Sequence, residues 1–313
     1  MKIVIVLGSG NSGAGAIHDY LQSRKDFQAP FNGKEFRIVN DPNGLDQLYN
    51  SLYNNFSING SANSIDEFRK FIINTHNSNY NKNKIFKKNL IKSSNKFLKQ
   101  ISKVVYNGSP RFYLDKLSLI KKINFYLKRL VFMKNAKEIQ MLQMTLPCDE
   151  KKFLKCAEKY LFSIFKSYKN FDKKKNIVIE QGGNFINPLN STKYYGKNRK
   201  IILVNRDPKA IFWSMKRRNS LSYPGNDIKK FVIWYKEILK KVINVKSKNI
   251  IKIKFESFFK NFNVEKIKLS QNLGISTRCK DNFDINHTLK NLYKFKDNLS
   301  KEEIRYLDDN LGE

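Results

Sequence analysis

The amino-acid sequence predicts an α/β fold, in which a parallel β-sheet is flanked by helices and carries a largely helical insertion. Three observations lead to this prediction. Short continuous apolar runs recur along the chain, as is typical of strands buried on both faces. Helical segments separate the later runs, and strands that alternate with helices imply a parallel sheet with right-handed crossovers. A glycine-rich loop directly follows the first run.

The expected elements follow in order. Residues 2–7 (KIVIVL) form the first strand, residues 8–15 the glycine-rich loop, and residues 16–24 a short helix. A second strand is expected at 35–39. The later elements are strands at 176–180, 200–205 and 249–254, and helices at 208–218 and 227–245.

The middle of the chain, residues 64–168, is expected to be a largely helical insertion within a single domain that spans residues 1–313. Apolar residues recur at helical spacing near both ends of this segment. Within it, residues 74–103 are rich in Asn and Lys and weakly patterned. We therefore expect a mobile, solvent-rich stretch there.

The composition of the 313 residues favours a folded protein with an anionic partner. A hydrophobic fraction of 41% and an aromatic fraction of 13% suffice for a core, so wholesale disorder is excluded. The net charge of +33 favours a nucleotide, an acidic glycan, a membrane surface or nucleic acid as partner. Part of this charge reflects a composition rich in Lys and Asn, so charge alone does not choose among these partners.

The three cysteines, Cys148, Cys156 and Cys279, are too few and too scattered for a disulfide framework or a zinc site, so no metal is expected. A reducing cytoplasm fits this usage. The chain starts with a strand, and neither a signal-peptide pattern nor an 18-residue apolar span is found. We therefore expect a cytoplasmic protein, with peripheral association with the inner membrane as an option.

The glycine-rich loop is the first candidate anion site. A strand, a glycine-rich turn and a helix in succession point unpaired backbone N–H groups at a phosphate, and the helix dipole adds positive potential. The candidate binding residues are Gly8, Ser9, Gly10, Asn11, Ser12, Gly13, Ala14, Gly15 and Ala16.

The loop also fits the pattern GxGxxG, which is the dinucleotide-binding fingerprint. That interpretation requires an acidic residue about 20 positions further on. Asp26 lies within the first crossover, and Asp41 follows too late in the sequence, so neither residue fits that requirement well. An ATP-binding P-loop is disfavoured because Gly13 is followed by Ala14 rather than Lys.

The fourth strand ends in a second candidate anion site. Arg206 closes the strand, Asp207 and Pro208 are suited to start a helix, and Ser214 lies two turns into that helix. A guanidinium fork and a hydroxyl can then converge on one phosphate.

At these residues the chain resembles the sulfotransferase superfamily, of the bacterial carbohydrate type. An Arg that closes a strand, Asp-Pro, and a Ser eight residues after the Arg match that family's 3′-phosphate motif at Arg206 and Ser214. The loop matches its 5′-phosphosulfate loop, and the run KIKFESFF from Lys252 is similar to a further family strand. The resemblance implies a P-loop NTPase-like fold and 3′-phosphoadenosine 5′-phosphosulfate (PAPS) as donor, without a metal.

The resemblance also implies catalytic residues, with departures. Many family members carry Lys or Arg where this loop has Asn11, so another cation must supply positive charge. Lys34-Glu35-Phe36 resembles the region that carries the base in heparan-type sulfotransferases, which makes Glu35 the expected base and Lys34 the expected cation. Lys290 falls where the family has a basic cofactor-binding loop.

The expected function is therefore transfer of a sulfuryl group from PAPS to a hydroxyl of a glycan or glycolipid acceptor. A basic nucleic-acid-binding protein is an alternative, but the sequence has no recognisable module with interleaved aromatic and basic residues, so no nucleic-acid partner is expected. A dinucleotide-dependent oxidoreductase is another, and it leaves Arg206 and Ser214 unexplained.

Overall fold

The computed structural model describes residues 1–31, 34–78, 84–108, 110–131, 142–168, 170–242 and 244–312. The chain divides into two compact units, of which the first comprises Met1–Asn40 and Tyr168–Glu313 and the second Asp41–Ser167. The expected helical insertion, residues 64–168, lies in the second unit except for its last residue.

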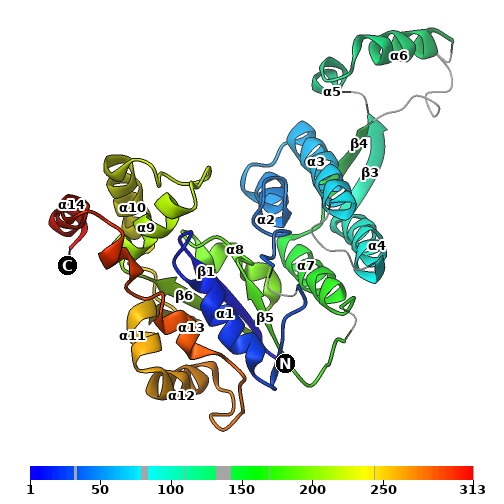
Figure 1. Ribbon diagram of the computed structural model, residues 1–313. Coiled ribbons are helices and arrows are strands. Elements are labelled where there is room, and N and C mark those ends of the chain that lie inside the picture. Colours follow the sequence, from blue (N-terminus) through cyan, green and yellow to red (C-terminus); the bar gives the residue numbers. More distant parts are fainter. Residues whose placement is uncertain are drawn as a thin grey trace. The chain divides into compact units, whose positions relative to one another are not determined.

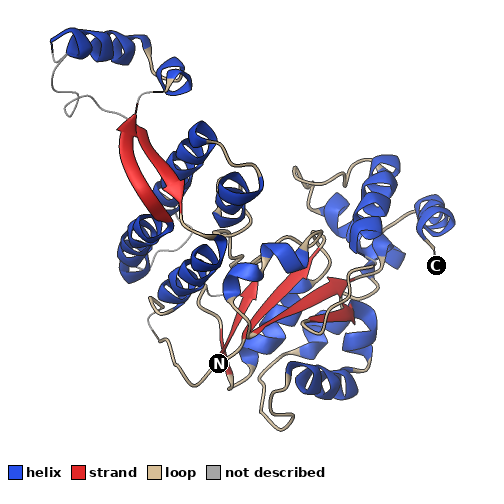
Figure 2. Ribbon diagram, turned by 180° about the vertical axis from the view of Figure 1, so that it is seen from behind, coloured by secondary structure: helices blue, strands red, loops and turns tan. Residues whose placement is uncertain are grey.

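The first unit contains a parallel sheet in the order β2-β5-β1-β6-β7 (Figures 1 and 2). All four neighbouring pairs are parallel. The strands are β1 (Ile3–Gly8), β2 (Phe27–Gln28), β5 (Asn176–Glu180), β6 (Arg199–Asn205) and β7 (Ile250–Lys254). The α/β class and four of the five expected strands are therefore confirmed.

Helices and turns of the first unit connect and cover these strands. They are α1 (Ala14–Ser23), α8 (Pro188–Ser191), η3 (Lys193–Tyr195), α9 (Pro208–Arg217), α10 (Ile228–Val242), α11 (Phe255–Lys260), α12 (Phe262–Leu273), α13 (Ile285–Leu289), η4 (Lys294–Asp297) and α14 (Lys301–Leu311). Side chains of a strand alternate between its two faces. Val4 and Val6 of β1 accordingly join Ile17 of α1 and the phenylalanines of α11 in one core cluster. Ile5 and Leu7, which alternate with them, are fully buried as well.

The prediction of a second strand at residues 35–39 is wrong. Residues 35–39 form a loop and a turn, and the strand that follows α1 is the two-residue β2. Phe36, Ile38 and Val39 are nevertheless fully buried. The apolar pattern of this segment therefore reflects burial in a loop and a turn, without a strand.

The second unit is mainly helical and contains a two-stranded sheet. Its elements are α2 (Leu45–Tyr49), η1 (Asn50–Asn54), α3 (Ile58–Asn77), α4 (Lys84–Ile101), β3 (Ser102–Gly108), α5 (Arg111–Asp115), α6 (Leu119–Val131), β4 (Leu142–Pro147) and α7 (Glu150–Phe165). The antiparallel pair of β3 and β4 was not expected from the sequence. The aromatic rings of Phe97 on α4 and Tyr160 on α7 stack at 4.8 Å.

The expected mobile stretch at 74–103 is also corrected. Residues 84–101 form helix α4, on which Leu90, Phe97 and Leu98 are buried. These positions repeat at i, i+7 and i+8 and so share one face. The many lysines and asparagines between them hide this pattern. Residues 79–83 lie outside the described part of the chain.

Candidate functional site

The site lies at the carboxyl edge of the parallel sheet. The chain leaves β1 toward β2 and β5 on one side, and it later returns to β6 on the other side of β1. Such a switch point is where open α/β sheets bind ligands. A cleft of about 1180 Å³ opens there. Its lining includes all nine residues of the loop 8–16 together with Glu35, Glu180, Arg206, Ser214 and Arg218.

The glycine-rich loop has a backbone that exposes the start of α1. Gly10, Asn11 and Gly13 have positive φ angles of 28°, 58° and 87°. Gly13 is the N-cap of α1, and no side chain caps the helix. A Cβ atom on Gly13 would lie 2.3 Å from the Phe255 ring, so only glycine fits there. The first turn of α1 therefore offers N–H groups and a positive dipole end to an anion.

Arg206, which follows β6, reaches this loop. Its Nη1 donates a hydrogen bond to the main-chain oxygen of Asn11 at 3.2 Å, and its Nη2 donates to that of Asn291 at 3.4 Å. The guanidinium also lies over the Phe255 ring, 4.9 Å from its centroid. Only 10% of the side chain is exposed. Burial lowers the pKa of Arg206, with Glu256 opposing that shift, and a guanidinium remains charged in this environment.

Ser214 contacts the same loop residue from α9. Its Oγ donates to the Oδ1 of Asn11 at 3.4 Å. Asp207 accepts from the N–H of Lys209 at 2.8 Å and Pro208 opens the helix, as expected from the sequence. The two candidate anion sites therefore adjoin at Asn11 and form parts of one cleft.

Two polar atoms of this cleft have no hydrogen-bond partner. Within the described residues, the buried side-chain nitrogen and oxygen atoms that lack one are Ser12 Oγ and Arg206 Nε. Glu256 Oε1 lies 3.9 Å from Arg206 Nε, which is beyond hydrogen-bond reach. Orphaned buried polar groups are rare, and an unseen water or ligand is a common cause. Both atoms belong to the predicted binding residues.

Two carboxylates, Glu35 and Glu180, line the cleft together. Glu180 ends β5, and a Cβ atom on Gly15 would lie 3.2 Å from its Oε1. The N–H of Phe36 donates to the Glu180 carbonyl at 2.7 Å, which holds the Glu35 segment beside β5. Burial raises the pKa of Glu180 to about 7, with the charge of Glu35 adding to the shift and that of His18 opposing it.

The two lysines that were expected to supply positive charge do not line the cleft, whereas Glu35 does. Lys34 and Lys290 are exposed, and neither is among the lining residues of the cleft. The lining contains a second guanidinium instead, that of Arg218. Arg218 follows Ser214 by four residues, which is one helical turn, and its charge contributes to the lowered pKa of Arg206. This i+4 spacing from Ser214 is a signal that sequence reasoning missed.

An aromatic pair borders the loop on another side. Tyr223 and Trp234 both line the cleft, and their rings meet edge to face at 5.6 Å. A Cβ atom on Gly10 would lie 2.5 Å from the Tyr223 ring, so this ring packs directly on the loop. Burial raises the pKa of Tyr223, and the charge of Glu35 adds to the shift.

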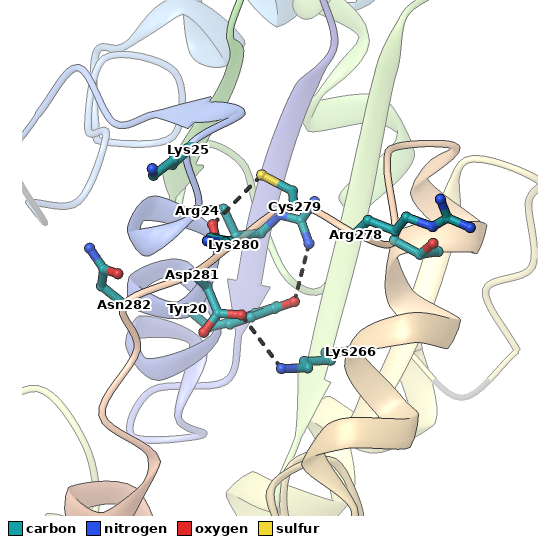
Figure 3. Close-up of a pocket in the computed structure, with 10 residues that line it drawn as sticks. Tyr20, Arg24, Lys25, Lys266, Arg278, Cys279, Lys280, Asp281 and Asn282 are labelled. Atoms are coloured by element: carbon teal, nitrogen blue, oxygen red, sulfur yellow. Dashed lines mark hydrogen bonds and ion pairs between the residues drawn. The ribbon is translucent and has the colours of Figure 1, made fainter.

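A second pocket, of about 560 Å³, lies beside Tyr20 and Arg24 of the α1 region (Figure 3). Arg24 donates to both carboxylate oxygens of Asp26 at 2.9 Å, and also to Ser270 and Ser276. Lys266 lies 3.6 Å from Asp281. These partners give Arg24 and Lys266 a structural role. The hydrogen bonds from Arg24 also occupy the carboxylate of Asp26, which is the acidic residue considered for a dinucleotide site.

No protein-family model matches the chain, and no curated protein matches it. Among solved structures, the sulfotransferase domain from the Synechococcus PCC 7002 olefin synthase is similar at 11% identity and a TM-score of 0.45. That likeness covers 98% of this chain and 93% of the other. At such a TM-score it carries no inference about function.

Two further observations concern the described residues. They contain no cluster of three or more His, Cys, Asp or Glu side chains suited to a metal ion. They also contain no helix with both the length and the apolar character needed to cross a bilayer.

Proposed function

We propose that the cleft binds PAPS and that the protein transfers its sulfuryl group to a hydroxyl. One observation carries this proposal: Arg206 and Ser214 both contact Asn11 of the glycine-rich loop. A main-chain anion cradle and a guanidinium with a hydroxyl thus face one cleft. A nucleotide with phosphates at both its 3′ and 5′ positions matches two such adjoining sites.

The residues present fit this donor. The loop 8–16 would hold the 5′-phosphosulfate through its N–H groups, and Arg206 and Ser214 would hold the 3′-phosphate. The orphaned Nε of Arg206 supports the second assignment, because it is a donor without an acceptor. The orphaned hydroxyl of Ser12 supports the first, because it lies within the loop.

The bound donor supplies an activated sulfuryl group, whose bond to the bridging phosphate oxygen breaks as the acceptor oxygen bonds to sulfur. The chain must take up the hydroxyl proton, and a general base works best with a pKa near the operating pH. Glu35, the expected base, and Glu180 lie together in the cleft. We propose that this pair receives the proton, with Glu180 suited to the task by its pKa of about 7.

Positive potential at the leaving phosphate must come from a group other than Asn11, which is neutral. Arg218 lines the cleft and is our candidate for this cation. Lys34 and Lys290, proposed from the resemblance, stay predictions.

A glycan or glycolipid is the proposed acceptor class. The aromatic pair Tyr223 and Trp234 supports this, because aromatic faces stack on sugar rings and Tyr223 lies against the loop. The oxidoreductase alternative loses support because Asp26 is bound by Arg24. Asp26 also precedes β2, which places it at the amino ends of parallel strands, opposite the loop.

The test is an assay for transfer. Purified protein is incubated with sulfur-labelled PAPS and a panel of glycan and glycolipid precursors, and sulfated product and adenosine 3′,5′-bisphosphate are quantified. We expect both products in equal amounts. Glu35→Gln and Glu180→Gln are then compared, and the variant that removes the general base should lose about 10²–10⁴-fold in kcat. Full activity in both variants would contradict the role of the carboxylate pair as proton acceptor. Failure of the protein to bind PAPS would contradict the proposed function as a whole.

A further inference from the structure

Helix α6 (Leu119–Val131) exposes its apolar face to solvent. Seven large apolar side chains of this helix are between 51% and 81% exposed. They are Leu119, Ile120, Ile123, Tyr126, Leu127, Leu130 and Val131. Exposed apolar residues that occur singly are ordinary, whereas a contiguous apolar patch marks an interaction surface.

The helical repeat places these seven side chains on one face. At about 100° per residue they fill a continuous arc of about 140°, from Tyr126 to Val131. Phe125, the one buried residue of the helix, lies outside this arc on the opposite side. A helix that packs on a protein core buries its apolar stripe. In α6 this stripe is exposed, and nothing in the described part of the chain covers it.

Basic residues flank the arc on both sides. Lys122 and Arg129 lie beyond its Tyr126 edge, and Lys121 and Lys128 lie beyond its Val131 edge. No acidic residue occurs between Lys116 and Val131. Among the described residues none of these four cations forms an ion pair. The helix therefore presents an apolar stripe bordered by free positive charge.

We propose that α6 binds an anionic lipid bilayer, lying in the plane of its surface. An apolar stripe with cations on both flanks suits this environment, because the stripe enters the acyl boundary while the lysines reach the phosphates. Its 13 residues are too few to span the hydrocarbon core, which takes about 20. A neutral partner surface would leave the flanking cations unused, and so the charge favours anionic lipid.

The proposal concerns the second compact unit and does not depend on the cleft. It supplies a means by which the protein would meet a membrane-bound acceptor. Nucleotide binding by the cleft and lipid binding by α6 are separate properties. Failure of one in experiment therefore leaves the other unaffected.

The test is co-flotation of the full chain with vesicles. Phosphatidylcholine vesicles are compared with vesicles that contain an equal share of phosphatidylglycerol. We expect binding to the anionic vesicles that weakens with added salt, and at least thirtyfold weaker binding to the neutral ones. Lys121→Gln with Lys128→Gln should reduce the partition coefficient about twenty-fivefold, since each cation near such a surface contributes about fivefold. The matched control is Lys173→Gln with Lys174→Gln, which removes the same charge elsewhere.

The apolar stripe is tested by Ile120→Glu with Leu127→Glu, which should reduce binding on the order of a hundredfold or more. Its control, Val264→Glu with Ile267→Glu, changes two exposed apolar residues of α12 that are 55% and 44% exposed. Circular dichroism verifies folding of each variant. Absence of vesicle binding, or equal binding by the α6 variants and their controls, overturns the proposal. A dimer that the Ile120→Glu and Leu127→Glu pair dissociates, without any effect on vesicles, would assign α6 to a second copy instead.

Discussion

The guanidinium of Arg206 donates a hydrogen bond to the main-chain oxygen of Asn11 at 3.2 Å, across 195 positions of the sequence. This contact joins the end of β6 to the loop after β1, the central strand of the sheet. It places a buried positive charge at the border of a main-chain anion cradle. The proposal that one nucleotide occupies both anion sites depends on this proximity.

Replacement of Arg206 should weaken nucleotide binding strongly. A hydrogen bond to a charged group contributes about 1.5–3 kcal/mol, so Arg206→Ala should lower the affinity for adenosine 3′,5′-bisphosphate tenfold to a hundredfold. Isothermal titration calorimetry measures this. Arg217→Ala is the control, since Arg217 lies over the Trp213 ring and is not a lining residue. Equal losses in both variants would indicate a nonspecific charge effect.

Removal of the Ser12 hydroxyl should weaken nucleotide binding without lowering the stability of the protein. Ser12→Ala deletes a buried group without a partner, so the free energy of unfolding should stay within about 0.5 kcal/mol or increase, while nucleotide affinity falls. Ser191→Ala is the contrasting case, because the Ser191 hydroxyl accepts from Asn184 at 2.7 Å and donates to Asn187 at 2.8 Å. That variant should lose about 1–3 kcal/mol with unchanged affinity. Urea denaturation and calorimetry together provide both quantities.

The sequence predicted the strands around the cleft because buried parallel strands contain continuous apolar runs, and β1, β5 and β6 all have this form. In β7 two lysines interrupt the run IIKIK, and only Ile253 is buried. The loop and Arg206 were predicted because each follows such a strand directly, and Ser214 was predicted because it lies eight residues after Arg206, on the helix that follows. Asn11 as their meeting point was not predictable, since it depends on the distance between two loops that are far apart in sequence.

Other features lay beyond sequence reasoning for physical reasons. Burial of Glu180 results from the packing of several elements, so its raised pKa leaves no local signature. Segment 35–39 has the apolar content of a strand, but it forms a loop and a turn that contact β5 through the hydrogen bond from the Phe36 N–H to the Glu180 carbonyl. Strands β3 and β4 are separated by more than 30 residues, so no hairpin turn signal marks their pairing.

Stability should depend on pH through Glu180. Its pKa is raised from 4.5 to about 7 in the folded protein, so the folded state holds this proton more tightly than the unfolded chain does. The stabilisation is complete below about pH 4.5 and is lost as the pH rises through 7. Its size is on the order of 3 kcal/mol.

Glu180→Gln should therefore flatten the fall in the free energy of unfolding between pH 5 and pH 8, whereas Glu158→Gln on the exposed side of α7 should keep it. Urea titrations at a series of pH values measure the slope. The same slope in Glu180→Gln and in the unmodified protein would show that the Glu180 carboxyl titrates as an ordinary surface group.

The loop should not tolerate a side chain at Gly13. Gly13→Ala combines a φ of 87° with a Cβ atom 2.3 Å from the Phe255 ring, so we expect a loss of about 1–3 kcal/mol in stability and of nucleotide binding. Gly15→Ala serves as comparison, because its Cβ would meet only the movable carboxylate of Glu180 at 3.2 Å. Thermal unfolding with and without nucleotide measures both. A Gly13→Ala variant that binds normally would show that the loop backbone is not the cradle.

The most direct measurement of the central claim is calorimetry with two nucleotides, adenosine 3′,5′-bisphosphate and adenosine 5′-monophosphate. If Arg206 and Ser214 bind the 3′-phosphate, the bisphosphate should bind at least tenfold more tightly, and Arg206→Ala should abolish that difference while it leaves the monophosphate affinity nearly unchanged. Equal affinities for the two nucleotides in the unmodified protein, or no measurable binding of the bisphosphate, would contradict the assignment of this cleft.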